Sequence, residues 1–271
     1  MDVCGELERG LVVRTQAMAF ELSPGERRFL SPSWASEAAK NVNLRPGAAV
    51  ARGASGSESD LAALGAMMGR YADAAEALLD TVAPRYSAGR TRGNTSFRPI
   101  AISDAPRSWR SDDRRLHADS FTSNPVHGRR ILRVFTNVHP GGEAREWQVG
   151  EPFPDYARRF FPRVKAPLPG AARVLAALGI TKSRRSAYDH YMLGMHDAAK
   201  SDLRYQRETP RETMTFAPGD TWIVFTDQVV HAAMRGQYAL EQTFYVDVER
   251  MEDRGSSPLA VLEGLAGRRL A

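Results

Sequence analysis

Cysteine is almost absent from this chain of 271 residues, in which Cys4 is the only one. A single cysteine excludes an intrachain disulfide framework, so the simplest expectation is a reducing compartment. The first residues are acidic and are followed by no long apolar run, which argues against a secretory signal. No later segment approaches the ~18 unbroken apolar residues that span a bilayer. We therefore expect a soluble or peripheral protein in the cytoplasm.

Lysine is also scarce, and arginine supplies most of the positive charge behind a net charge of +5 and a pI near 9.5. An excess of arginine slightly favours recognition of planar carboxylate or phosphate groups, although a GC-rich genome gives the same bias. The charge has two interpretations: solvated loops, or contact with an anionic membrane, an acidic substrate or nucleic acid. It is concentrated in three basic stretches, at residues 84–115, 158–165 and 182–185.

The amino-terminal region, residues 1–90, has the pattern of helices. A Ser-Pro-Gly-Glu sequence at residues 23–26 suits the start of a helix that continues through Leu30. Residues 47–59 are rich in Gly, Ser and Ala, which predicts a loop. Apolar residues then recur at helical spacing over residues 61–82, which predicts a helix with one face packed inside the protein.

Beyond residue 95 the chain changes to short β-like runs separated by turns. We expect a β-rich core over residues 95–250, a helical insertion within it at residues 152–208, and a terminal helix within residues 255–271. Strands on both sides of a helical insertion, preceded by helices, predict one domain over residues 1–271 with a β-rich α+β fold. The predicted strands cover residues 95–102, 116–121, 131–138, 146–149, 213–216, 221–226 and 240–248, and the predicted helices of the insertion cover residues 155–161, 171–178 and 186–205.

His117 and Asp119 are two residues apart in one of these runs. On a strand, side chains at that spacing project to the same face, so the imidazole and the carboxylate can bind one ion. His231 follows the run at residues 221–226, at an interval typical of a double-stranded β-helix, or jelly roll. Two histidines and a carboxylate form the facial triad of non-haem Fe(II) oxygenases, which leaves positions open for 2-oxoglutarate and O₂. We therefore predict an iron site at His117, Asp119 and His231.

The remaining histidines compete poorly as metal ligands. His127 and His139 precede Gly and Pro residues typical of turns, and His190 and His196 are six residues apart on a predicted helix, where they face different ways. A zinc hydrolase would favour more closely spaced histidines or cysteine ligands, and neither is present. We expect all four to be structural or surface residues.

A 2-oxoglutarate enzyme needs a cation for the distal carboxylate, and a bidentate arginine serves best. Arg133 lies in the middle of an apolar strand, where it must face solvent or be paired inside. Asn137 shares its parity and would line the same face. We therefore predict that Arg133 and Asn137 contact 2-oxoglutarate. Gln242 is a further predicted contact, and Arg235 is the alternative cation, because many oxygenases place that group after the last metal ligand.

Arg98 and Arg145 also lie in or beside predicted strands. Either could be a surface residue, because arginine is mostly exposed in folded proteins. If they face the cavity of the barrel, they would bind an acidic substrate. We take both as candidate substrate-binding residues.

Longer segments around these residues are similar to a known family. They run from about residue 96 to residue 245 and are far more specific than a His-x-Asp pair. The chain resembles the 3-deoxy-D-manno-oct-2-ulosonic acid (Kdo) 3-hydroxylases of Gram-negative bacteria, and the regions outside this range resemble the family more weakly. The similar segments are SFRP at 96–99, SWRSDD at 108–113, LHADSF at 116–121, RILRVF at 130–135, VGEPF at 149–153, TKSRRSAYDH at 181–190, FTDQVVHAA at 225–233 and LEQTF at 240–244.

The resemblance implies a double-stranded β-helix enzyme that uses Fe(II), 2-oxoglutarate and O₂. It also implies hydroxylation at C3 of a Kdo sugar in the lipid A inner core, at the cytoplasmic face of the inner membrane. The products would be D-glycero-D-talo-oct-2-ulosonic acid, succinate and CO₂. Clustered arginines suit such a substrate, because Kdo carries a carboxylate and lipid A carries phosphates. The basic stretches at residues 158–165 and 182–185 would hold the enzyme against an anionic membrane.

Two other functions remain open. One is a 2-oxoglutarate oxygenase that acts on another acidic substrate or on a protein. The other is a non-catalytic β-barrel that binds an anionic glycolipid through its arginines, although such a module has no need of an intact triad. Release of succinate would separate the two. Nucleic-acid binding is not expected, because the aromatic and basic residues form no recognisable platform for a single strand.

Overall fold

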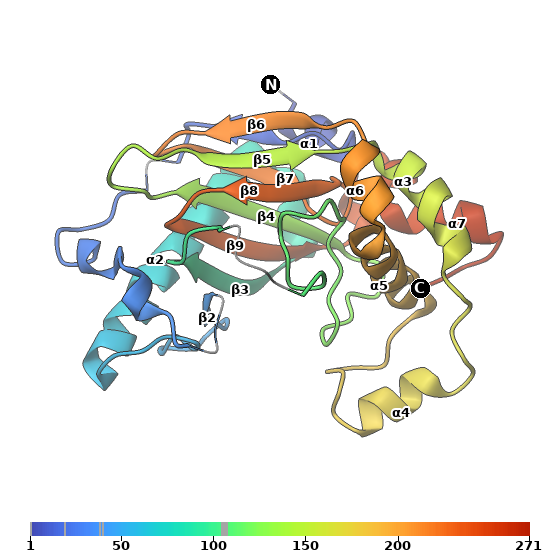
Figure 1. The fold of residues 1–271 in the computed structure, drawn as a ribbon, viewed down its shortest axis with the longest axis horizontal. Coiled ribbons are helices and arrows are strands. Elements are labelled where there is room, and N and C mark those ends of the chain that lie inside the picture. The colour runs from blue at the N-terminus through green and yellow to red at the C-terminus, as the bar shows by residue number, and fades with distance from the viewer. Residues whose placement is uncertain (1, 19, 38, 40, 104–107) are drawn as a thin grey trace.

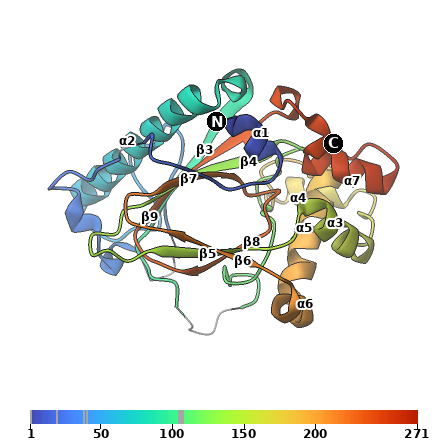
Figure 2. The ribbon, with the colours of Figure 1, turned by 90° about the horizontal axis from the view of Figure 1, so that it is seen from above.

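Two antiparallel sheets face each other and form the core of the protein (Figure 1 and Figure 2). The computed structural model describes residues 2–18, 20–37, 39, 41–103 and 108–271. This is the predicted β-rich α+β fold, a double-stranded β-helix. The larger sheet has the order β1 (Val13–Thr15), β7 (Thr221–Phe225), β4 (Arg130–Asn137), β9 (Ala239–Val246), β3 (Arg90–Arg98) and β2 (Val42–Leu44), and the smaller sheet has the order β6 (Glu212–Phe216), β5 (Arg145–Val149) and β8 (His231–Arg235).

Helices cover one face of the larger sheet and gather at one end of the two sheets (Figure 2). The long helix α2 crosses the outer face of the larger sheet, and α4 projects away from the rest of the protein (Figure 1). Within the described residues, no helix combines the length and hydrophobicity needed to cross a membrane. The α-helices are α1 (Val3–Glu8), α2 (Glu58–Val82), α3 (Phe153–Phe160), α4 (Ala171–Ala177), α5 (Ala187–Ser201), α6 (Leu203–Glu208) and α7 (Pro258–Ala266).

Helix α2 confirms the prediction made from its apolar spacing. It begins with a capping box, in which Ser57 and Asp60 satisfy each other's backbone amides. Its buried face, which includes Leu64 and Met68, packs in the same core as the larger sheet. Tyr71 on this face donates a hydrogen bond from its hydroxyl to the carbonyl oxygen of Val134, at 3.1 Å. The helix is therefore fixed to the sheet by apolar burial and by a buried polar contact.

The side chains of strand β4 show that the two faces of the larger sheet have different environments. Leu132 and Val134 point toward α2 and belong to its core, whereas Arg133 and Phe135 line the space between the sheets. Phe135 stacks on Trp222, with ring centroids 5.1 Å apart, and neighbouring aromatic rings fill one end of that space. The other end is left open to polar side chains, and the candidate site lies there.

Most other predicted elements are confirmed with shifted ends. The strand expected at residues 95–102 is β3, which ends at Arg98, and the helix expected at residues 186–205 is divided into α5 and α6 at Asp202. The side chain of Asp202 caps α6 by accepting a hydrogen bond from the amide of Tyr205. The terminal helix expected within residues 255–271 is α7.

Two predicted elements are wrong. Residues 23–30 hold only a short 3₁₀ helix, Arg27–Phe29, because the Ser23 and Glu26 side chains cap each other's backbone amides in a single turn. Residues 116–121 do not form a strand, since His117 makes only an isolated bridge to His231. His231 itself begins β8, a strand that is not among those predicted from the sequence.

Candidate active site

Three predicted metal ligands lie together at the open end of the barrel. One ligand atom from each of His117, Asp119 and His231 lies within 4.8 Å of the other two. The backbones of His117 and His231 exchange two hydrogen bonds, of 3.1 and 2.9 Å, which join the segment at residues 116–121 to β8. The Asp119 amide donates to the carbonyl oxygen of Thr226 at 2.7 Å. Backbone contacts therefore fix all three side chains relative to one another.

Both histidines use Nδ1 for a contact with a backbone carbonyl, which leaves Nε2 available to a metal. Nδ1 of His117 lies 2.7 Å from the carbonyl oxygen of Arg115, and Nδ1 of His231 lies 2.8 Å from the carbonyl oxygen of Val229. A carbonyl oxygen can only accept, so each Nδ1 carries a proton and Nε2 is the ring nitrogen left to bind a metal. Burial lowers the pKa of His231 to about 4, which keeps that ring neutral. This is the protonation state that a metal ligand requires.

Asp119 is ionised and points toward the two histidines. Burial disfavours its charge, but Arg133 and His117 lower the pKa of this carboxyl well below its usual range. Oδ1 of Asp119 lies 3.4 Å from Nε2 of His117, and Oδ2 lies 3.1 Å from the Arg133 guanidinium. Two imidazoles and one carboxylate on one side of a cavity suit Fe(II) with open positions for other ligands.

Glu241 on β9 joins two of the predicted arginines. Its carboxylate lies 3.0 Å from Nη1 of Arg133 and accepts a hydrogen bond of 3.1 Å from Nε of Arg98. Glu241 is opposite Phe135 in the β4–β9 register, so its side chain faces the space between the sheets. Glu241 is not among the site residues predicted from the sequence. The signal that could have found it is a carboxylate in a strand that also carries large apolar residues.

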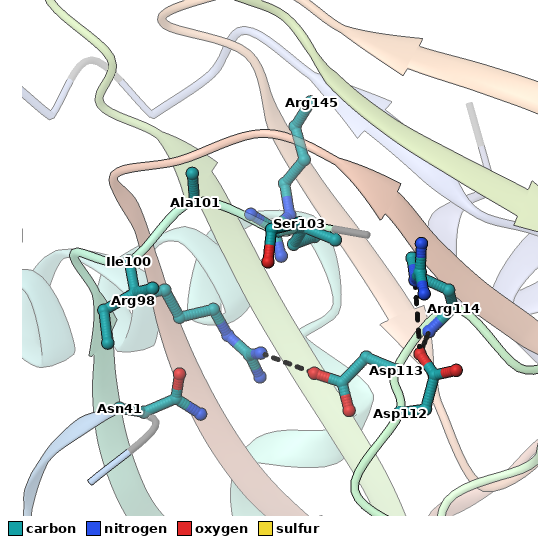
Figure 3. Close-up of a pocket in the computed structure, with 10 residues that line it drawn as sticks. Asn41, Arg98, Ile100, Ala101, Ser103, Asp112, Asp113, Arg114 and Arg145 are labelled. Atoms are coloured by element: carbon teal, nitrogen blue, oxygen red, sulfur yellow. Dashed lines mark hydrogen bonds and ion pairs between the residues drawn. The ribbon is translucent and has the colours of Figure 1, made fainter. Parts of the chain in front are cut away.

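Arg145 at the start of β5 is the exceptional cation of the site. It is 2% exposed, yet it makes no hydrogen bond or ion pair with any described residue. Burial, and then the charge of Arg98, lower the pKa of Arg145 to about 9. Figure 3 shows Arg98 and Arg145 directed into one pocket, with Arg98 reaching toward Asp113. A buried guanidinium without a partner is costly, so this geometry indicates a place for an anion.

The charges of this pocket suit a cation and a dianion together. Three arginines face three carboxylates, so the described side chains are close to neutral as a group; the arginines are Arg98, Arg133 and Arg145, and the carboxylates are Asp113, Asp119 and Glu241. A divalent metal bound to the triad would leave two positive charges uncompensated. A dicarboxylate such as 2-oxoglutarate would neutralise them. The donor atoms and the charge therefore both fit Fe(II) with 2-oxoglutarate.

Two further aromatic rings contact the triad. Trp147 on β5 stacks against His231, with ring centroids 4.8 Å apart and an angle of 18° between the planes. The ring of His196 on α5 meets the ring of His117 edge to face, at 5.2 Å. We expected His196 to be a structural or surface residue, and the structure places it beside the site without making it one of the three clustered ligands. Trp147 was also missed, because its partner is 84 residues away in the sequence.

Two predicted 2-oxoglutarate contacts lie elsewhere. Gln242 is opposite Val134, so it points to the α2 side of the sheet, where its amide donates to the carbonyl oxygen of Gly93 at 3.1 Å. Asn137 has the expected parity but lies at the far end of β4, where its amide donates to the carbonyl oxygens of Glu143 and Phe216, both at 3.0 Å. The structure does not bring either residue to the site, which corrects both expectations.

The alternative cation also lies outside the site. Arg235 is mostly exposed, and its guanidinium pairs with Glu143 at 3.3 Å. Arg98, Arg133 and Arg145, in contrast, all line the same cavity as the triad. The arginines that share the site with the metal ligands are therefore those of β3, β4 and β5, which precede His231 in the sequence.

The jelly-roll fold and the triad of two histidines and one carboxylate define the class: the protein is a non-haem Fe(II) and 2-oxoglutarate-dependent dioxygenase. A sequence model of the family described as 3-deoxy-D-manno-oct-2-ulosonic acid (Kdo) hydroxylase matches residues 1–269. The chain belongs to the Kdo hydroxylase family. A comparison with curated protein sequences gave no significant match.

Solved structures of the Kdo hydroxylase KdoO, a non-haem Fe(II) α-ketoglutarate-dependent dioxygenase, are similar to the chain over almost its whole length. The complex of KdoO with α-ketoglutarate and Fe(III) has 42% sequence identity and a TM-score of 0.94, and the match covers 99% of this chain and 90% of KdoO. The cobalt(II) complex has 43% identity and a TM-score of 0.94, with 98% and 90% covered. The complex with succinate and Fe(III) has 43% identity and a TM-score of 0.93, with 98% and 89% covered.

Proposed function

We propose that this chain hydroxylates C3 of Kdo in the lipid A inner core, giving D-glycero-D-talo-oct-2-ulosonic acid. The observation that carries the proposal is the triad of His117, Asp119 and His231 beside a buried arginine that has no partner. Membership of the Kdo hydroxylase family supports the sugar, and the α-ketoglutarate and succinate complexes of KdoO support the cosubstrate.

The triad would hold the iron through Nε2 of each histidine and one carboxylate oxygen of Asp119. When bound, Fe(II) and 2-oxoglutarate couple the oxidative decarboxylation of 2-oxoglutarate, which gives succinate and CO₂, to transfer of the other oxygen atom of O₂ into a C–H bond. The protein's own part is positioning. Arg115 and Val229 fix the histidine tautomers, Arg133 keeps Asp119 ionised, and Trp147 holds the plane of His231.

The arginines would divide the two acidic molecules between them. Arg133 already contacts Asp119 and Glu241, whereas Arg145 contacts no described carboxylate, so Arg145 replaces Arg133 as our choice for the distal carboxylate of 2-oxoglutarate. Arg98 lies in the cavity of the triad and also in the neighbouring pocket of Figure 3. It would bind the Kdo carboxylate at the mouth of the site.

We also propose that the enzyme works at the cytoplasmic face of the inner membrane, as a peripheral protein. The support for this is chemical. A lipid-anchored substrate confines the reaction to a bilayer surface, and the chain has basic stretches that an anionic surface attracts. Nothing in the proposed chemistry requires nucleic acid.

Mass spectrometry of lipid A cores tests the function. Cells with the intact gene should carry one added oxygen on Kdo, and cells without it should not. Restoring the gene with His231→Ala should leave the sugar unmodified. An unchanged mass spectrum in all three strains would contradict the proposed substrate, whereas oxygen added at a carbon other than C3 would contradict only the proposed position.

A further inference from the structure

Residues 165–185, which we call the arm, leave the body of the protein and return to it, with α4 near the tip (Figure 1). None of the seven residues of α4 is buried. The returning end of the arm is fixed to the segment that follows Asp119. The amide of Lys182 donates to the carbonyl oxygen of Ser123 at 2.9 Å, and the Arg185 guanidinium donates to that of Thr122. The arm therefore projects from a point close to the active site in the sequence and in space.

The arm exposes large apolar side chains. Among the described residues, eight such side chains are exposed, and four of them lie within residues 168–180. Leu168, Val174, Leu178 and Ile180 are each at least half exposed. Val174 lies in α4, and Leu178 is the residue that directly follows this helix, four positions further on. Single exposed apolar residues need no explanation, but a group of four on one projection indicates an interaction surface.

The charge of the arm has one sign. Residues 165–185 contain five cations and no aspartate or glutamate, so the arm alone accounts for the net charge of +5 of the whole chain. No described carboxylate pairs with Lys165, Lys182 or Arg184. The basic stretch at residues 158–165 differs, because its arginines pair with neighbouring carboxylates: Arg158 with Asp155, Arg159 with Glu151 and Arg163 with Asp202.

A bilayer surface matches this combination better than a protein partner does. Apolar side chains can enter the boundary between headgroups and acyl chains, while long basic side chains around them reach the phosphates. A seven-residue helix is also too short to be stable by itself in water, and burial of one face at an interface would stabilise it. An acidic protein surface would satisfy the cations but would need a matching apolar cavity for a projecting tip.

We propose that the arm inserts its apolar tip into the interface of an anionic phospholipid bilayer, with Lys182 and Arg184 bound to lipid phosphates. This extends the peripheral association proposed above, on which it rests, from attraction of charges to partial insertion of a defined segment. Because Thr122 and Ser123 bind the base of the arm and follow Asp119, insertion would set the active site at a fixed height above the headgroups. That is where the sugar of a lipid-anchored substrate lies.

Fluorescence tests insertion directly. Leu178→Cys is labelled with the environment-sensitive NBD fluorophore on the full-length protein, in which native Cys4 is buried. Vesicles of phosphatidylglycerol and phosphatidylcholine should shift the NBD emission to the blue, and brominated acyl chains should quench it. The same label on Leu11→Cys should show neither effect. Leu11 follows α1, which lies at the opposite edge of Figure 1 from α4.

Sedimentation with the same vesicles separates apolar insertion from attraction of charges. The double variant Val174→Ser/Leu178→Ser should bind about tenfold more weakly, and the loss should persist in high salt. The matched control, Leu11→Ser/Leu203→Ser, should bind like the wild type, because its two exposed leucines lie outside the arm. The charge variant Lys182→Glu/Arg184→Glu should lose binding that salt also removes.

Three other outcomes would each contradict the proposal. Binding without an NBD shift at residue 178 would mean attraction of charges without insertion. No binding to anionic vesicles would contradict both the arm and the peripheral association. Self-association of the wild type that Val174→Ser/Leu178→Ser abolishes would mean that a second copy covers the tip. Turnover of a short soluble Kdo glycoside should be equal in the wild type and in all arm variants, so a failure of the arm leaves the proposed chemistry separately testable.

Discussion

Arg130 and Arg145 are both fully buried arginines on strands of the same barrel, but their surroundings differ. Arg130 donates to Asp227 at 2.8 and 3.3 Å and to Gln228 at 2.6 Å, and its guanidinium lies 3.9 Å from the centre of the Phe225 ring. Arg145 has no such partner among the described residues. The two side chains have nearly the same exposure, 0% and 2%. Burial alone therefore does not distinguish them.

The difference distinguishes Arg130, which stabilises the fold, from Arg145, which is placed to bind a ligand. Desolvating a guanidinium is costly, and an ion pair with good hydrogen bonds offsets that cost. For Arg130 the compensating negative charge is Asp227, in the same chain. For Arg145 that charge must come from a bound molecule, and we propose that it is the distal carboxylate of 2-oxoglutarate.

The largest effect on stability is expected at Arg130. Arg130→Met leaves the Asp227 carboxyl buried without its partner, which should lower the free energy of unfolding by roughly 3–5 kcal/mol. Urea unfolding of the ligand-free protein measures it. The double variant Arg130→Met/Asp227→Leu removes both charges and should recover most of the loss. If the single variant were as stable as the wild type, Arg130 would not be a structural arginine and the comparison would fail.

The same substitution at Arg145 should act on binding instead. Arg145→Met should weaken 2-oxoglutarate binding by about 2–3 kcal/mol, because it removes a charged contact in a dry site. Anaerobic calorimetry on the Fe(II)-loaded protein measures this, and Fe(II) affinity should be nearly unchanged. Arg133→Met is the control, and it should weaken Fe(II) binding through Asp119. The reverse pattern would return the role to Arg133, as the sequence first suggested.

Gly236 supports Arg145 and offers a milder perturbation. Its φ is +120°, and a Cβ built on it would lie 2.9–3.0 Å from the backbone and side chain of Arg145. Gly236→Ala should therefore displace Arg145 and weaken 2-oxoglutarate binding by about 1–2 kcal/mol. Gly219, which also has a positive φ but no atom close to such a Cβ, provides the matched control. An equal effect from Gly219→Ala would show that the loss reflects backbone strain.

The smallest effect is a pH dependence of stability. Because the folded pKa of Arg145, about 9, is below that of the unfolded chain, the unfolded state binds more protons above pH 9. The wild type should thus gain stability relative to Arg145→Met by about 1 kcal/mol between pH 8 and pH 10. Urea unfolding of both proteins, free of ligand, measures the difference. A constant difference would mean that Arg145 keeps its proton and has a partner in solution.

The triad could be predicted from its residue types and spacing, but the reason given for His117 and Asp119 was wrong, because residues 116–121 do not form a strand. Backbone hydrogen bonds from His117 to His231 and from Asp119 to Thr226 bring the three side chains together instead.

The roles of the arginines were harder to predict, because they depend on partners that are distant in the sequence. Arg133 and Arg145 are both arginines in β-like runs, and only the positions of Asp119 and Glu241 show that the first is paired and the second is not.

Gln242 shows most clearly what cannot be predicted from the sequence alone. It is adjacent to Glu241, and a shift of one residue on a strand moves a side chain to the opposite face of the sheet. The sequence of β9 is largely buried on both faces, so its pattern does not indicate which of the two residues points into the barrel. Only the register with β4 decides it, by placing Glu241 opposite Phe135 and Gln242 opposite Val134.

The most direct test of the account is the stoichiometry of the purified enzyme with Fe(II), 2-oxoglutarate, O₂ and a Kdo-containing lipid A. We expect one succinate released for each Kdo that gains an oxygen at C3, and neither product with His231→Ala or Asp119→Ala. Succinate formation that does not depend on Kdo, or hydroxylated Kdo from either variant, would contradict it.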